Sequence, residues 1–180
     1  MTCFFRIKFG KSALLCYLWF ETRIMAAELD KIDFKILKLL QENGRITNLL
    51  LSQEIGLSPA PTLERVRKLE MSGYIKSYHA LVDEEKLGLG IKTFIQVQLD
   101  FHKNNTIQIF LDEVNHIKEI TECHHVTGQA DFLLKVYVND IKAYERLIMD
   151  KISKISVVKT FQTMMIMSTT KKEPIIPLEY

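Results

Sequence analysis

The chain has few cysteines, prolines and glycines, and no long run of apolar residues. Cysteine occurs at only three of 180 positions, with no pair at metal-ligand spacing, which argues against a disulfide scaffold and favours a reducing compartment. Four prolines and seven glycines are too few for a collagen-like or low-complexity protein. The formal net charge of +2 points neither to nucleic acid nor to a membrane surface. What remains, with 47% apolar residues, is an ordinary globular chain of one or two domains.

The most apolar stretch near the N-terminus, residues 13–20, is too short to span a bilayer, which takes about 20 residues. Basic residues precede it, as in an export signal. We expect residues 1–24 to be an N-terminal extension of one of two kinds. Either they are upstream sequence and Met25 is the natural start, which is favoured, or they form an export signal. The rest of the chain is expected to be cytoplasmic, without a membrane partner.

Three amphipathic helices are expected in the first domain, residues 25–82. The first ends at Asn43 and Gly44, and Thr47 caps the second, which ends at Gly56. Ser58 caps the third, and Pro59 falls at the first helical position, where its missing N–H costs nothing. Three short helices with a tight turn before the third predict a helix-turn-helix.

The third helix is expected to enter the major groove of double-stranded DNA with its outer face, while Leu63, Val66 and Leu69 form the inner face. Small groups at its start allow close approach, and its basic residues reach phosphates or guanine edges. The alternatives are a solvated face, whose basic residues pair with neighbouring glutamates, or a protein-interaction module. The expected DNA-binding residues are Ser58, Ala60, Thr62, Glu64, Arg65, Arg67 and Lys68.

Residues 74–82 alternate and predict a strand, and the polar, glycine-ended residues 83–90 predict a hinge or linker. The second domain, residues 91–170, follows the order β-α-β-β-α-β of a ferredoxin-like α+β fold. Its strands are expected over residues 91–99, 119–126, 131–138 and 157–169, with helices opening at Asn104 and at Asn139. Residues 171–180 are expected to be a polar tail.

The last strand of this domain is apolar on both sides, although the helices of such a fold cover only one face of the sheet. An uncovered apolar face favours a partner subunit, and we therefore expect a homo-oligomer. The alternative is a core strand in a slightly larger monomer.

The segment that joins the second and third of these strands concentrates polar groups. The Gly128 N–H could bind a carboxylate and Asp131 an ammonium group, so together they would hold an amino acid, with Met164 and Met165 as adaptable apolar surface. Equally, Asp131 could merely cap the start of the strand. Cys123 and His125 would share one side of a strand but lack a third ligand. No metal, no cofactor and no catalytic constellation is expected.

Three stretches of the chain resemble the Lrp/AsnC (leucine-responsive and asparagine-responsive) transcriptional regulators. They are residues 29–46, residues 55–75 and the hairpin segment 122–135, and the resemblance runs over about residues 29–170. It implies a winged-type helix-turn-helix joined by a hinge to a metabolite-binding ferredoxin-like domain. It also implies dimers that often assemble into octamers.

The resemblance further implies that a small effector, commonly an amino acid, binds between subunits near the hairpin. His125 stands where the family has an aliphatic residue, so an effector other than leucine is expected. The implied effector-binding residues are His125, Thr127, Gly128, Gln129, Asp131, Ile141, Met164, Met165 and Ile166.

The sequence therefore predicts a sequence-specific, nucleoid-associated DNA-binding regulator that responds to an amino acid and is not an enzyme. One alternative is a tetrapyrrole enzyme of the siroheme decarboxylase type, since those enzymes resemble the family and use histidines near the sheet. The other is an architectural DNA-binding protein that ignores metabolites.

Overall fold

A computed structural model describes residues 29–101 and 105–178 of the chain. The expected N-terminal extension, the start at Met25 and the helix opening at Asn104 fall outside these residues. The chain divides into two compact units. The sheet unit is Leu81–Lys172, and the helical unit is the chain up to Ala80 together with Glu173–Tyr180.

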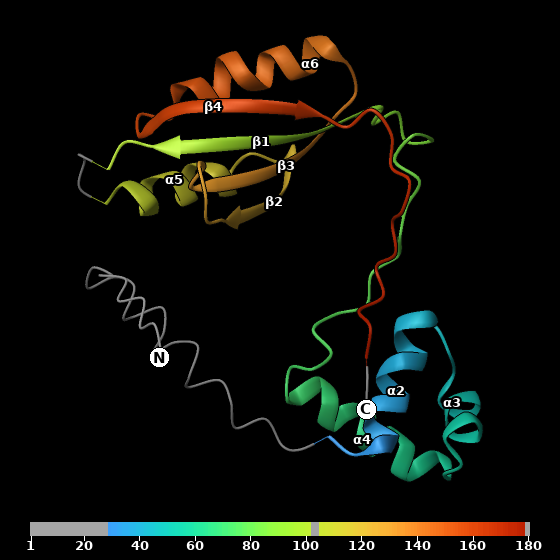
Figure 1. Ribbon diagram of the computed structural model, residues 1–180. Helices are drawn as coiled ribbons and strands as arrows, with labels where there is room; N and C mark the ends of the chain where they lie inside the picture. The colour runs from blue at the N-terminus through green and yellow to red at the C-terminus, as the bar shows by residue number, and fades with distance from the viewer. Residues whose placement is uncertain (1–28, 102–104, 179–180) are drawn as a thin grey trace, which may run out of the picture. The chain divides into compact units, whose positions relative to one another are not determined.

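The helical unit contains the three expected helices (Figure 1). Helix α2, Lys31–Glu42, begins with a capping box in which Asp30 and Asp33 each accept the other's backbone N–H, and it ends at Asn43. Helix α3, Asn48–Ile55, is capped by the Thr47 hydroxyl and ends at Gly56. The left-handed conformation of Gly56, with φ 75°, suits glycine at a helix end. Helix α4 is Pro59–Met71.

The three helices of this unit pack through a small apolar core. Ile36 of α2, Leu51 and Ile55 of α3, and Leu69 of α4 are buried together. Each helix turns one stripe inward, so the helical periodicity of the sequence and the packing agree.

The strand expected over residues 74–82 is wrong: these residues form no strand. A strand needs a neighbour to accept its backbone hydrogen bonds, and none of the described strands pairs with this segment. Residues 74–80 instead belong to the helical unit, where the Tyr78 hydroxyl donates to Glu70 Oε1 at 3.0 Å.

The sheet unit has the expected β-α-β-β-α-β order. The elements are β1 (Ile91–Leu99), α5 (Thr106–Asn115), β2 (Ile120–His125), β3 (Phe132–Val138), α6 (Ile141–Arg146) and β4 (Val158–Met165). Helix α6 continues through a π turn, Leu147–Lys151, and a 3₁₀ turn, Ile152–Lys154. The sheet order is β2-β3-β1-β4, and every neighbouring pair is antiparallel. The ferredoxin-like α+β fold is confirmed.

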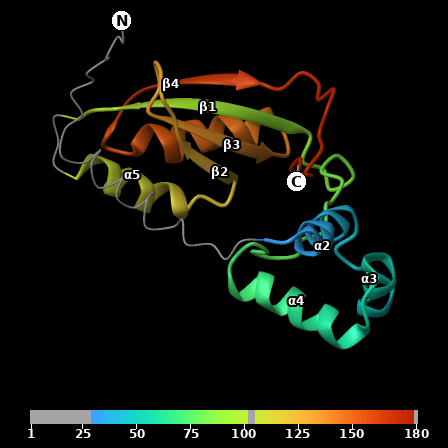
Figure 2. The same cartoon turned by 60° about the horizontal axis from the view of Figure 1, so that its bottom comes forward.

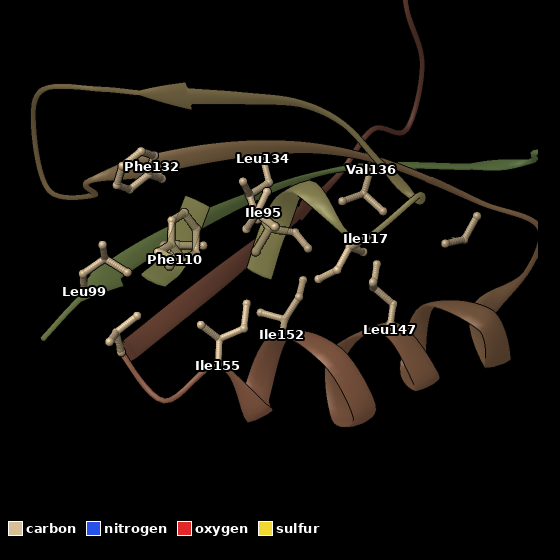
Figure 3. Packing of buried hydrophobic residues seen from close by; sticks show 14 residues of the cluster. Ile95, Leu99, Phe110, Ile117, Phe132, Leu134, Val136, Leu147, Ile152 and Ile155 are labelled. Carbon is tan, nitrogen blue, oxygen red and sulfur yellow. The ribbon is translucent and has the colours of Figure 1, made fainter. Parts of the chain in front are cut away.

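Both helices cover the same face of the sheet (Figure 2). Every second residue of β1 and β3 points into this layer, and Ile95, Leu134 and Val136 are fully buried there. Figure 3 shows them meeting Phe110 of α5 and Leu147 and Ile152 of the helix after β3. This layer is the core of the sheet unit.

The opposite face of the sheet carries no helix of the described chain. Phe94, Leu133, Tyr137 and Met164 occupy it, between polar residues such as Gln96. We call these four residues the open-face cluster. The last strand ends at Met165 rather than at residue 169, although the Ile166 N–H still donates to the Lys92 carbonyl of β1 at 2.9 Å.

The expected linker, residues 83–90, is folded into turns. Asp83 Oδ1 accepts the backbone N–H groups of Glu85 and Lys86, both at 3.1 Å. Glu84 accepts Lys172 Nζ and lies 3.5 Å from Lys92 Nζ. In the described part of the chain, no helix combines the length and hydropathy of a membrane span.

The core of the sheet unit generates a direct stability prediction. Leu134→Ala should lower the free energy of unfolding by about 3 kcal/mol, because it leaves a cavity beside residues that are themselves fully buried. Urea denaturation followed by far-UV circular dichroism measures this change. Met149→Ala is the control, since Met149 is 62% exposed and should stay within about 0.5 kcal/mol of the parent. Equal losses in the two variants would contradict the described core.

Candidate functional site

The start of α4 is shaped by two prolines. Ser58 is the N-cap residue, as the sequence predicts, but its hydroxyl makes no capping bond. Its carbonyl oxygen instead accepts from Thr62, from the backbone N–H at 3.3 Å and from the hydroxyl at 2.9 Å. Pro59 and Pro61 have no N–H, so they leave no unsatisfied donors at these positions. Asn48 Nδ2 donates to the Pro59 carbonyl at 2.8 Å and thereby fixes the start of α3 against the start of α4.

The faces of α4 differ in two places from those expected. Thr62, expected to contact DNA, is fully buried, and its bond to Ser58 lets the hydroxyl lie in the core without losing a partner. Leu63, expected to point inward, is 39% exposed. The inner face is Thr62, Val66 and Leu69, which follow the i, i+4, i+7 spacing of a helix. Of the expected DNA-binding residues, those exposed are Ser58, Ala60, Glu64, Arg67 and Lys68.

Arg65 is held by two carboxylates rather than exposed for a ligand. One of its guanidinium nitrogens lies 2.8 Å from Asp30 Oδ2 and 2.8 Å from Asp33 Oδ1. The Asp33 side chain is only 6% exposed, so this ion pair neutralises a carboxylate that would otherwise be buried alone. The backbone N–H of Asp33 and then the Arg65 guanidinium hold the pKa of Asp30 below its usual value.

We define the Arg65 clamp as Arg65, Asp30 and Asp33. It joins the capped start of α2 to the middle of α4 and so fixes the angle between the two helices. The sequence places Arg65 on the outer face of α4, and the clamp pairs its charge with two carboxylates of the helical unit, of which only Asp33 is buried. The sequence contained one sign of this ion pair, namely two carboxylates three residues apart at a helix start. Such a pair can accept a cation as well as cap a helix.

The hairpin segment between β2 and β3 turns at Gly128, whose φ of 121° strongly favours glycine. The Asp131 backbone N–H donates to the Val97 carbonyl, and Asp131 Oδ2 accepts the Leu99 N–H at 2.8 Å. The β1–β4 pairing shifts register between Gln98 and Leu99. Asp131 therefore satisfies an N–H of β1 at this irregularity, rather than one at the start of its own strand, which was the expected structural alternative.

The side chain of Gln98 attaches the hairpin segment to the sheet. Gln98 Nε2 donates to the carbonyl of Gln129, while Gln98 Oε1 accepts from the Thr160 hydroxyl at 2.9 Å. Thr127, Gly128 and Gln129 are exposed at the tip of this turn, which the bonds of Gln98 hold against the sheet.

The histidines of β2 have separate environments. The His125 ring stacks on the buried Phe132 ring, with centroids 4.8 Å apart and planes 16° apart. His124 Nε2 lies 3.0 Å from Glu122 Oε2, and Lys135 Nζ lies 2.5 Å from Glu122 Oε1. Lys135, and then His124, lower the pKa of Glu122, while burial raises the pKa of the Cys123 thiol. Among the described residues, no three His, Cys, Asp or Glu side chains form a metal-ligating group.

The expected effector-binding residues form two groups within the chain. The hairpin group, His125, Thr127, Gly128, Gln129 and Asp131, lies where β3 begins, since Phe132 pairs with Val97. The β4 group, Met164, Met165 and Ile166, lies toward the other end of β1, where Met165 pairs with Thr93. Thr93 and Val97 are four residues apart, or about 13 Å along a strand. Ile141, 56% exposed at the start of α6, follows the strand end that pairs with Ile91.

Both units match known families. Residues 29–76 match a winged helix-turn-helix DNA-binding domain, and residues 92–176 match the Lrp/AsnC ligand binding domain. The leucine-responsive regulatory protein of Escherichia coli K12 is 39% identical over 145 residues, covering 81% of this chain and 88% of that protein. The transcriptional regulator AzlB of Bacillus subtilis is 35% identical over 155 residues, covering 86% and 99%.

Solved structures agree with these matches. The transcriptional regulator NMB0573 of Neisseria meningitidis, crystallised as an L-Met complex, superimposes with a TM-score of 0.80 at 34% identity and covers 83% of this chain and 97% of its own. An AsnC family regulator from Agrobacterium tumefaciens gives a TM-score of 0.77 at 30% identity, with the same coverage of both chains. These relatives are regulators rather than enzymes, so the tetrapyrrole-enzyme alternative is wrong. The chain belongs to the Lrp/AsnC family of DNA-binding transcriptional regulators, and its sheet unit is the family's ligand-binding domain.

Proposed function

We propose that this regulator reads specific DNA sequences with the exposed face of α4 and that an amino acid, bound between two subunits, controls it. The observation that carries the DNA-binding part is the division of α4 into two faces. One is packed inward by Thr62, Val66 and Leu69, and the other is exposed along its length.

The proposed DNA contacts are the exposed members of the predicted set. Because Pro59 and Pro61 have no N–H, the backbone N–H of Ala60 is the proposed amide contact, and its small side chain allows close approach to the duplex. Arg67 and Lys68 supply positive charge for phosphates, and Glu64 faces outward where it can accept from a base. Arg65 is left out of this set, because its charge is engaged by the clamp. Its proposed role is to hold α4 at the angle that docking requires.

The proposed effector site needs two subunits because its residues are separated within one. The hairpin group and the β4 group lie about 13 Å apart along β1, too far for one amino acid to contact both. Two copies facing each other through a two-fold axis could bring the hairpin group of one beside the β4 group of the other. The L-Met complex of the Neisseria relative supports an amino acid as the effector class.

The open-face cluster supports a homodimer, because its apolar side chains lie on a sheet face that none of the described helices covers. We further propose that dimers assemble into octamers and act in the cytoplasm, where their DNA target lies. An effector that binds between subunits favours the arrangement it fits best, so it shifts the spacing of the DNA-binding units.

Salt dependence separates the proposed DNA contacts from the clamp. Lys68→Gln should weaken binding and make the slope of log K against log salt shallower by about one, since one phosphate contact is lost. Arg65→Gln should weaken binding but leave that slope unchanged, because no phosphate contact is removed. Fluorescence anisotropy of a labelled duplex across a salt series measures both quantities.

Asp33→Asn is the matched variant, since it breaks the clamp from the side of α2 and should reproduce the effect of Arg65→Gln. Urea denaturation should show that the double variant is no less stable than the worse single one. A slope change of about one for Arg65→Gln would instead place Arg65 on a phosphate.

Mixing two defective subunits tests the shared effector site. Thr127→Arg should block the hairpin group and Met165→Arg the β4 group, so each homodimer should lose the thermal shift that amino acids such as L-Met produce. Co-expressed together, they should recover part of the shift, since each mixed dimer has one intact site. Light scattering checks that both variants keep the oligomeric state of the parent.

No recovery in the mixed dimers would place the site within one subunit. A parent protein that gives no shift with any amino acid, and whose DNA affinity none of them changes, would favour the architectural alternative.

A further inference from the structure

The end of the chain returns to the helical unit and docks on a single side chain of α2. Gln41 Oε1 accepts the Ile176 N–H at 2.7 Å, and Gln41 Nε2 donates to the Ile176 carbonyl at 3.3 Å. A carboxamide carries one acceptor and a pair of donors, so it can satisfy both main-chain groups of one residue. An antiparallel strand pairs with its neighbour in the same reciprocal way. Ile176 is therefore recognised through its backbone, although its side chain is 67% exposed.

Two prolines favour an extended conformation of residues 173–178, the segment that makes this contact. Pro174 and Pro177 fix their own φ angles and favour extended conformations at the residues before them, Glu173 and Ile176. The segment is thus extended before it docks and loses less conformational entropy on docking than a flexible tail would.

The base of the same segment is fixed to the sheet unit. Lys172 Nζ donates to Glu84 Oε1, and Lys92 Nζ lies 3.5 Å from Glu84 Oε2. The Glu84 side chain is 18% exposed, and Lys172 is the largest cause that lowers its pKa to about 2. The tail therefore leaves the sheet unit from a point where it is ion-paired to residues 83–90.

The first connection between the units is anchored near the second. Tyr78 donates to Glu70 and packs 3.5 Å from where a Cβ on Gly44 would lie. Gly44 is three residues beyond Gln41, so both connections reach the same end of α2. The chain passes between its units at residues 80–81 and again at 172–173. Each passage has a side-chain anchor on the helical unit.

We propose that residues 173–178 are a second tether, which docks on Gln41 of the same chain and limits the freedom of the DNA-binding unit. One connection would let that unit swivel, whereas two anchored connections restrict it. In a dimer, this restriction raises the effective concentration of the second recognition helix once the first is bound. The docking stands on its contacts alone, and its consequence for DNA rests on the proposed function.

Hydrogen exchange at the Ile176 amide tests the docking without DNA. In the full-length protein this amide should exchange roughly threefold to tenfold more slowly than in a free peptide of residues 173–180. Gln41→Ala should restore the free rate. Gln53→Ala, which removes an exposed glutamine from α3, is the matched control and should change nothing. An Ile176 amide that exchanges at the free rate in the parent would overturn the tether.

A crosslink shows which chain Gln41 holds. To keep the Gln41 carboxamide, cysteines are placed at Lys38→Cys, one helical turn before Gln41 on α2, and at Ile176→Cys, whose backbone contacts remain. The native cysteines are replaced by serine, and the two new ones are joined by a short bismaleimide. A crosslinked monomer on a denaturing gel supports the tether. A crosslinked dimer means that the tail docks on another subunit, and no crosslink means that it docks nowhere; either result overturns the proposal.

A variant that ends after Lys172 tests whether the tether strengthens binding to DNA with two half-sites. Affinity for a duplex with two half-sites should fall by about tenfold, while affinity for a single half-site should change less than about twofold. An equal fall on both duplexes, or no fall on either, would contradict a tethering role. If the parent binds neither duplex, the proposed function fails, while the hydrogen-exchange result still decides the docking.

Discussion

The pairing of β1 with a neighbour on each side is the constraint on which the sheet unit depends. β1 lies between β3 and β4, and its register with each sets which side chains point toward the helices. Ile95 and Val97 are fully buried, so a shift of one residue would exchange them for polar neighbours such as Gln96. Because this exchange is so unfavourable, the register is strongly specified. The open-face cluster, the hairpin and the position of β4 all follow from it.

The same strand separates the parts of the proposed effector site. Its end near Leu99 holds the hairpin through Asp131, and its other end holds Met165. A rigid strand keeps these groups apart in one chain, which is why the site proposed for an amino acid draws on a second chain. In this proposal, effector binding and assembly are linked by geometry, because each subunit supplies only part of the site.

The helical unit combines a small apolar core with an ion-pair contact between helices. Four buried apolar residues hold the three helices together, and the Arg65 clamp adds a charged connection between α2 and α4. A guanidinium that donates to two carboxylates fixes the relative orientation of the three groups, in addition to attracting them. The clamp thus positions the face of α4, while the residues free to meet a ligand are its exposed neighbours.

Local signals in the sequence determined most of the elements. Thr47, Gly56 and Gly128 act through the backbone within a few residues of themselves, so their effects could be read directly. The alternation of residues 91–99 predicted β1 to its last residue, because burial on one side repeats every second position. The family resemblance extended these signals to the fold, but it could not place individual side-chain contacts.

Only the tertiary structure decided where the polar side chains find their partners. Arg65 meets Asp33 from 32 residues away, Asp131 meets Leu99 from 32, and Gln41 meets Ile176 from 135. Residues 74–82 show that local sequence also does not reveal strand pairing. Their alternation predicted a strand, but a strand does not form without a neighbour. A cap or a turn is determined by adjacent residues, whereas an ion pair or a strand pairing depends on what the folded chain brings beside it, and the local sequence does not contain that information.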